Sequence, residues 1–353
     1  MRFDVDFFRD LCLAPGPTGF EGPVQQVVRR RVGAVAPPSG DPLGNLWADV
    51  NPGASPQVVV AGHADQIGLI VTYVDDDGFV YFEKIGGVDH QLLPGRCLVI
   101  HAAGGPVEGV VGRKPTHFIP TDERGKAPDL HEQFIDIGAR SRAAALERVS
   151  IGDPITFEPR FIELADDTYA ALACDDRAGV YVAFRGLELY AQRPGAARLT
   201  AVSTVHEETT FMGARAQALR LAPACVVVVD GDFATDHPTV EPAKAGGAVK
   251  LGGGPVLARG TGSNAALFAL ARDVAKAEGI DVQIKAAASA MSTDADELMA
   301  AGVAATLSLS VPMRYMHSPF EVVRGDDLEA AAVLVAALAR RLGEVWQPGL
   351  LVP

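Results

Sequence analysis

The sequence has few cysteines, and those it has stand far apart. They are Cys12, Cys97, Cys174 and Cys225 in a chain of 353 residues, and no two form a Cys-x-x-Cys pair. Zinc ribbons and disulfide-stapled domains need such pairs or a regular cysteine framework, so neither class fits this chain. We interpret the four cysteines as small buried apolar side chains.

Long hydrophobic runs are also missing. No apolar stretch approaches the roughly 20 residues that cross a membrane as a helix. The chain begins MRFDVD, with acid where a secretory signal needs base followed by an apolar stretch. We therefore expect a cytoplasmic protein that has no membrane partner.

Basic residues are outnumbered by acidic ones. The sequence has 31 lysines and arginines against 44 aspartates and glutamates, which gives a formal net charge of -13 at pH 7. Such a charge disfavours nucleic acid as a partner, because phosphate binding needs clustered base. We expect bound metal to neutralise part of the acid.

The length of the chain predicts two domains. Residues 1–68 and 166–353 alternate helical patterns with apolar, strand-like runs, which predicts a doubly wound α/β sheet. Residues 69–165 contain many short β-type runs broken by glycine, proline and aspartate, and a single helical stretch near residues 142–148. This composition predicts a compact β module inserted into the α/β domain.

Two adjacent carboxylates follow the most prominent of the apolar runs. Residues 199–205 read as a buried strand, and Glu207 and Glu208 stand just beyond its carboxyl end. Ligands bind at that end of the strands in open α/β sheets. Two neighbouring like charges are costly unless a cation holds them, so a metal or catalytic site competes here with a solvated strand end.

Four further segments place histidine or aspartate just after an apolar run. They carry His63 and Asp65, Asp175 and Asp176, Asp230 and Asp232, and His317. If the runs are strands of one sheet, these residues converge on one edge of it. Two histidines with several carboxylates suit Zn²⁺, Co²⁺ or Mn²⁺, and a carboxylate bridging two ions would make a two-metal hydrolytic site.

These segments resemble those of the tetrahedral-type dinuclear metalloaminopeptidases, a family that includes glutamyl and deblocking aminopeptidases and is often labelled endoglucanase. The resemblance covers nearly the whole chain. Its main motifs are residues 14–21 (APGPTGFE), 62–65 (GHAD), 175–177 (DDR), 207–208 (EE) and 314–319 (RYMHSP). The last of these is the most specific.

The resemblance implies a zinc-peptidase-like mixed sheet and two divalent ions, zinc or cobalt with manganese as a further candidate. It assigns His63 and Asp230 to one ion, Glu208 and His317 to the other, and Asp175 to a bridge between them. It also implies that Glu207 is the general base, and that Asp65 orients the imidazole of His63. The small β-barrel-like insertion would be a dimerisation domain, and the dimers would assemble further, up to a dodecamer.

The chain departs from the family pattern at a few positions near these motifs. Gln66 stands where an acid is common, His206 where glutamine is common, and residues 209–212 (TTFM) replace a more usual VGLR. No departure removes an implied ligand. The roles of Arg177 and Asp294 stay open at this point.

We therefore predict an aminopeptidase that acts on peptide substrates, with two alternatives. A glycosidase needs two carboxyl groups ~5 Å or ~6.5–9.5 Å apart across one bond. In an extended chain Glu207 and Glu208 would point to opposite sides, and the two histidines would have no role. A non-catalytic assembly scaffold would have no need for the whole ligand set.

Overall fold

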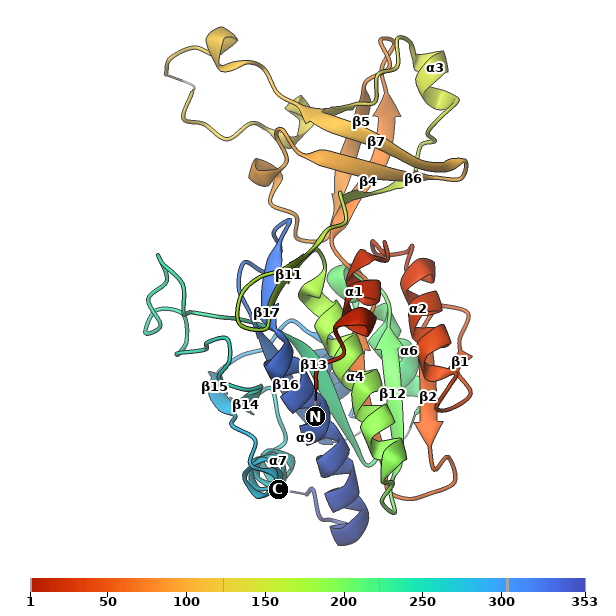
Figure 1. Cartoon of the computed structure of the whole chain (residues 1–353), viewed down its shortest axis with the longest axis vertical. Coiled ribbons are helices and arrows are strands. Elements are labelled where there is room, and N and C mark those ends of the chain that lie inside the picture. Colours follow the sequence, from red (N-terminus) through yellow and green to blue (C-terminus); the bar gives the residue numbers. More distant parts are fainter. Residues whose placement is uncertain (1, 123, 222, 303–304, 353) are drawn as a thin grey trace.

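The computed structural model describes residues 2–122, 124–221, 223–302 and 305–352. A six-stranded barrel stands at one end of the molecule, and the larger part below it is a sheet covered by helices (Figure 1). Both parts were predicted, as a doubly wound mixed sheet and as a β-barrel-like insertion, and the structure confirms them.

The larger sheet has eight strands and is mixed. In spatial order they are β1 (Ser39–Gly40), β2 (Leu46–Val50), β12 (Arg198–Thr204), β3 (Gln57–His63), β13 (Cys225–Phe233), β16 (Ala305–Met313), β14 (Val256–Gly260) and β15 (Gln283–Ala287). The four central strands, β12, β3, β13 and β16, are parallel, whereas β2 and β14 run antiparallel to the central strands that they pair with. The carboxyl ends of the central strands therefore meet at one edge.

Helices cover both faces of this sheet. One face carries α1 (Val5–Leu13), α2 (Gly22–Val32), α4 (Cys174–Gln192), α7 (Ala265–Glu278) and α9 (Gly325–Val345), and the other carries α6 (Met212–Arg220) and α8 (Asp294–Ala300). Alternate residues of β3 enter two separate cores: Val58 and Val60 face the α4 side, whereas Val59 and Ala61 face the α6 side. This double burial explains why the central strands read as unbroken apolar runs.

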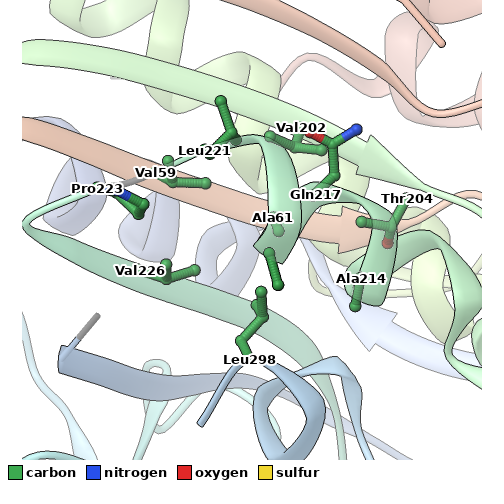
Figure 2. A pocket seen from close by; sticks show the side chains of 11 residues that line it. Val59, Ala61, Val202, Thr204, Ala214, Gln217, Leu221, Pro223, Val226 and Leu298 are labelled. Carbon is green, nitrogen blue, oxygen red and sulfur yellow. The ribbon is translucent and has the colours of Figure 1, made fainter. Parts of the chain in front are cut away.

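The thinner core under α6 and α8 contains a small cavity (Figure 2). Side chains of Val59, Val202, Val226 and Leu298 line it, and nearly all of its lining is apolar. Leu298 extends to it from α8, so the packing that holds this helix on the sheet surrounds a small empty space.

The barrel closes on itself and has its own core. Its strands follow the order β4 (Gly68–Val74), β5 (Val80–Ile85), β8 (Phe134–Asp136), β7 (Gly105–Gly112), β6 (Cys97–Ala102) and β9 (Pro154–Phe157), and β9 pairs back with β4. Leu69, Leu98, Ile135 and Ile155 are buried inside it. Four short helical elements lie between its strands in the described chain: η1 (His90–Leu92), η2 (Thr116–Phe118), η3 (Leu130–Glu132) and α3 (Arg142–Leu146).

A three-stranded antiparallel sheet lies beside the larger one. It consists of β10 (Phe161–Glu163), β11 (Thr168–Ala171) and β17 (Glu321–Arg324). β10 falls within the range 69–165 expected for the insertion, yet it pairs with β11 and not with the barrel. β11 leads directly to Asp175, and β17 begins just after His317, so this sheet positions two of the implied ligands.

The cysteines follow the expectation in three cases out of four. Cys12, Cys174 and Cys225 are buried, but Cys97 is exposed where β6 begins on the barrel, so its prediction as a buried side chain is wrong. None of the helices within the described ranges has the length and apolar character needed to span a membrane.

Candidate metal centre

The ends of three parallel strands assemble the predicted site. β12 and β3 run in register so that Thr204 lies opposite His63, and β13 pairs with the other side of β3. His63 ends β3, and the pair Glu207 and Glu208 follows β12. Asp230 lies in the carboxyl-terminal half of β13, so the predicted convergence at one edge is what the sheet produces.

The carboxylate of Asp175 lies between the two predicted histidines. Its Oδ1 is 3.3 Å from Nε2 of His63, and its Oδ2 is 3.2 Å from Nε2 of His317. Nε2 of His317 is also 3.6 Å from Oε2 of Glu208, and Nε2 of His63 is 3.8 Å from Oε2 of Glu207. Residues far apart in the sequence therefore present their ligand atoms to one small volume.

The donor set fits divalent metal ions. Three groups of ligand atoms each lie within 4.8 Å of one another: His63 with Glu207 and Asp230, His63 with Asp175 and Glu208, and Asp175 with Asp176 and Asp230. Oδ1 of Asp175 is buried and makes no well-formed hydrogen bond, although His63 is close. An acceptor placed between imidazole nitrogens and left without a hydrogen is suited to coordinate a cation.

Burial disfavours the ionised form of the carboxyl groups in this cluster. It raises the pKa of Glu207 to about 11, an effect that His63 opposes and Asp230 reinforces. Burial and the charge of Asp175 raise the pKa of Glu208 to about 7. Burial would also raise the pKa of Asp175, but the adjacent imidazoles of His317 and His63 outweigh it and hold that pKa below the usual range. Two histidines do not balance this many carboxylates, and divalent cations would.

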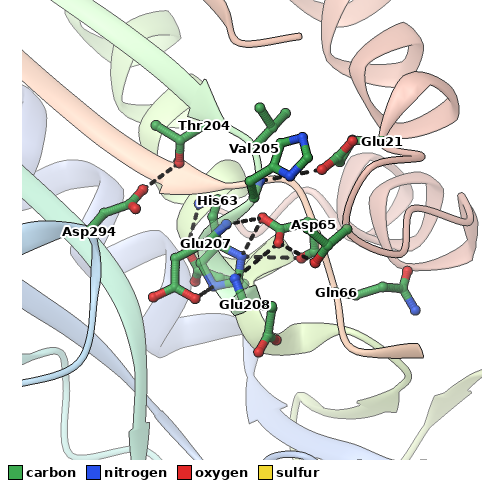
Figure 3. A network of polar contacts seen from close by, with 12 residues as sticks. Glu21, His63, Asp65, Gln66, Thr204, Val205, Glu207, Glu208 and Asp294 are labelled. Atoms are coloured by element: carbon green, nitrogen blue, oxygen red, sulfur yellow. Dashed lines mark hydrogen bonds and ion pairs between the residues drawn. The ribbon is translucent and has the colours of Figure 1, made fainter. Parts of the chain in front are cut away.

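Asp65 connects the histidine strand to the glutamate pair (Figure 3). Its Oδ1 accepts the backbone N–H of Glu207 at 2.9 Å, and its Oδ2 accepts that of Glu208 at 3.0 Å. The hydroxyl of Thr18 donates to the same Oδ2 at 2.7 Å. Nδ1 of His63 lies 3.2 Å from the backbone carbonyl of Asp65 and 3.5 Å from its carboxylate. Asp65 is thus placed to orient both ends of the site.

The glutamate pair does not lie in an extended strand. Glu207 and Glu208 begin the short helix α5 (Glu207–Thr210), flanked by His206 and Phe211 in the left-handed region at φ 62° and 55°. The expectation that they point to opposite sides of a strand is therefore wrong, since neighbours on a helix are separated by about 100°. Both side chains can face the same volume, and both are more than nine-tenths buried.

Glu321 is a site residue that the sequence did not indicate. Its Oε2 accepts the backbone N–H of Asp175 and its Oε1 accepts that of His317, each at 2.8 Å. The available signal was a charged residue at the head of the apolar strand β17, four positions after His317. Thr18 was missed in the same way, although it lies inside the motif at residues 14–21.

Asp176 and Arg177 form hydrogen bonds with residues of the surrounding elements. Asp176 accepts the N–H of His63 at 3.1 Å and that of Gly179 at 2.8 Å. The buried guanidinium of Arg177 donates to the carbonyl of Leu11 and to the side chain of Gln66. Arg177 therefore holds the loop after His63, and its hydrogen bonds reach no ligand carboxylate.

Asp294 lies next to the site without entering the ligand groups. Oγ1 of Thr204 donates to its Oδ2 at 2.6 Å, whereas its buried Oδ1 has no hydrogen-bond partner within the described chain (Figure 3). Burial raises the pKa of Asp294 to about 6.

A cavity of ≈ 390 Å³ opens over the ligand groups. His63, Asp175, Glu208 and His317 form part of its wall. Gly87, just beyond β5 of the barrel, also lines it, and a Cβ at this position would lie 2.6 Å from Nδ1 of His317. The barrel therefore reaches the site, and only glycine leaves His317 in place there.

The chain is similar in sequence and fold to known aminopeptidases. A family model described as M42 glutamyl aminopeptidase matches residues 44–334. The chain is 32% identical to the lysyl aminopeptidase of Pyrococcus furiosus over 349 residues, covering 96% of this chain and 97% of the relative.

Solved structures with the same fold cover almost the whole chain. A TET aminopeptidase from a marine sediment archaeon of the Thaumarchaeota is 30% identical, with a TM-score of 0.90 and coverage of 96% of each chain. The Pyrococcus horikoshii TET1 peptidase, described as assembling into a tetrahedron or a large octahedral shell, is 29% identical. Its TM-score is 0.85, with coverage of 95% of this chain and 98% of that one.

Proposed function

Because the chain belongs to the M42 glutamyl aminopeptidase family, we propose that it is a cytoplasmic dinuclear metalloaminopeptidase that removes N-terminal residues from peptides. The observation that carries the dinuclear assignment is the Asp175 carboxylate, with one oxygen near His63 and the other near His317. A carboxylate in this position can serve two ions at once.

We assign the ligands as the resemblance implies. His63 and Asp230 would hold one ion, Glu208 and His317 would hold the other, and Asp175 would be a ligand to both. Zinc and cobalt suit this mixture of imidazole and carboxylate, and manganese is the further candidate. When bound, the two ions would polarise the scissile carbonyl and lower the pKa of an attacking water toward ~7.

Glu207 is the residue that takes the proton of that water. Its carboxylate is buried beside the ligand groups, and its backbone is held by Asp65 at 2.9 Å. A carboxylate outside the ligand set, beside the attacking water, is what a general base requires. The charge of bound ions would favour the ionised form of Glu207 and so counter the rise in pKa that burial causes. Glu207 then passes the proton to the leaving amine, so one side chain serves both halves of the reaction.

The comparisons and the geometry both argue against the glycosidase alternative. The family model and the P. furiosus relative are both described as aminopeptidases. The two histidines also lie close to the carboxylates that a glycosidase would need to keep free: His63 is 3.8 Å from Glu207, and His317 is 3.6 Å from Glu208. A non-catalytic scaffold would likewise have no need for this cluster of buried carboxylates.

We also propose that the barrel assembles the chain into a homo-oligomer, with a dimer as the building block and a dodecamer as a possible end point. Large apolar side chains are exposed on it: Tyr73, Val110, Phe118, Leu146 and Ile151. Exposed apolar side chains such as these would gain by leaving water in a subunit contact. The solved relatives include an assembly described as a dodecamer.

The test of the proposed function combines metal content with substrate choice. We expect about two equivalents of metal per chain after loading with Zn²⁺ or Co²⁺, measured by elemental analysis, and hydrolysis of aminoacyl anilides that a chelator abolishes. Cellulose should not be cleaved. Anilide hydrolysis that is unaffected after complete metal removal, or cleavage of cellulose in the presence of chelator, would overturn the proposal.

A further inference from the structure

One wall of the cavity over the metal centre is apolar. Phe211, Phe233, Met291 and Met316 line it, and none of the four belongs to the candidate ligand set. Phe211 lies between α5 and α6, Phe233 ends β13, Met291 precedes α8, and Met316 precedes His317. Four separate segments therefore contribute apolar side chains to the lining of one cavity, and we call these four side chains its apolar wall.

Among the residues that the structure describes, no further charged side chain lines this cavity. Apart from the six ligand and base residues His63, Asp175, Glu207, Glu208, Asp230 and His317, the other described lining residues are Gly87, Gly231, Ser292 and Thr293. A charged substrate side chain placed against this wall would lose its hydration without meeting an opposite charge, which is costly. An apolar side chain would gain by leaving water.

The wall can also adjust to its occupant. A Cβ at Gly231 would lie 2.6 Å from Cε of Met316, so the glycine leaves room for this methionine to lie over β13. Methionine side chains fill irregular space and adapt to different apolar partners. Phe233 is 59% exposed, so its ring presents apolar surface that a bound side chain would cover.

We propose, resting on the aminopeptidase function above, that this wall is the subsite for the N-terminal side chain of the peptide and selects uncharged, apolar residues. Leucine, methionine and phenylalanine fit it, whereas glutamate and lysine lack a counter-charge there. Phe233 and the two methionines determine this specificity. The chain then differs in preference from its relative named lysyl aminopeptidase and from the glutamyl activity in the family's description.

The first experiment compares kcat/KM of the metal-loaded full chain on leucine, methionine, phenylalanine, glutamate and lysine p-nitroanilides. We expect the three apolar substrates to exceed glutamate and lysine by at least about tenfold. Free L-leucine should likewise inhibit more tightly than free L-glutamate, which reads binding separately from turnover. Equal or faster cleavage of the glutamate or lysine substrate would overturn the inference and leave the aminopeptidase function standing. No cleavage of any anilide by protein that holds both metals would overturn both.

The second experiment places a charge in the wall. Phe233→Lys should raise the ratio of glutamate to leucine cleavage at least about tenfold, because the ammonium supplies the missing counter-charge. Ile284→Lys is the matched control, because it adds the same charge to the chain. Ile284 is 51% exposed on β15 and lies outside the cavity. An unchanged ratio in a folded Phe233→Lys protein, or an equal change in the control, would remove Phe233 from the subsite.

Discussion

The carboxylate of Glu321 accepts a hydrogen bond of 2.8 Å from the backbone N–H of His317. Its second oxygen accepts the backbone N–H of Asp175 at the same distance. His317 has a left-handed backbone at φ 62°, which a residue with a side chain adopts only when its surroundings hold it there. One buried side chain thus sets the separation of two candidate ligands.

Glu321→Gln should weaken metal binding. The amide keeps one acceptor oxygen but points an NH₂ group at a backbone N–H, so one of the two hydrogen bonds is lost. Partners that orient metal ligands are typically worth about 10–100-fold in affinity. Competition with a chelating dye would measure the change. Glu329→Gln is the control, because Glu329 is equally buried on α9 but pairs with Arg185. Equal metal affinity in the two variants would contradict the role of Glu321.

The two members of the glutamate pair should respond differently to the same substitution. Glu207→Gln removes a base but no ligand, so it should keep both metals and lower kcat at least ~100-fold. Glu208→Gln should instead lower the metal content, because it removes a ligand. Elemental analysis beside steady-state kinetics separates the two effects. If Glu207→Gln loses metal while Glu208→Gln keeps it, the two assignments are reversed.

The cavity under α8 predicts a stability effect. Leu298 is 6% exposed and lines it, so Leu298→Ala enlarges an existing gap and should lower the free energy of unfolding by about 2–5 kcal/mol. Urea denaturation measures the change. Met299→Ala, at the next position on α8 and 37% exposed, should alter stability by no more than about 0.5 kcal/mol. Similar losses in both variants would mean that the packing around the cavity does not hold α8.

A histidine in the barrel should make stability depend on pH. Burial lowers the pKa of His101 below its ordinary value of 6.5, so the folded chain binds fewer protons there than the unfolded chain does. Its contribution is therefore fully present above that ordinary value and is lost as the pH falls from there through the lowered pKa of the folded chain. We expect the wild type to lose more stability than His101→Gln between about pH 7.5 and about pH 5, as measured by urea unfolding. A parallel decline in both proteins would exclude His101 as a source.

Charges on the barrel should disrupt the assembly. Val110 and Ile151 are 50% and 54% exposed, and replacing both with aspartate would bring unpaired charge into an apolar subunit contact. Light scattering should show a lower mass than for the wild type. Val352→Asp, 72% exposed outside the barrel, should leave the mass unchanged. A wild-type chain that is monomeric at micromolar concentration would rule out the proposed role of the barrel.

The sequence predicted those parts of the structure in which a local pattern of apolar and charged residues reflects how the folded chain buries them. β3 and β13 are apolar on both faces because both faces are buried, and His63 and Asp230, which follow their apolar runs, could therefore be placed on one edge. Glu321 could not be found in this way, because its importance lies in two backbone groups from other segments. Residues 207–210 form one helical turn, which is too short for a periodic pattern to reveal.

The approach of Gly87 to His317 has a consequence for how the two parts of the chain work together. The barrel enters and leaves the larger domain close to the metal centre: four residues separate the end of β3 at His63 from the start of β4 at Gly68. A Cβ at Gly87 would lie 2.6 Å from the imidazole of His317, so the barrel backbone and a candidate ligand are in close packing. We therefore expect that contacts which fix the orientation of the barrel also affect the affinity for metal, and that metal binding in turn affects those contacts by the same factor.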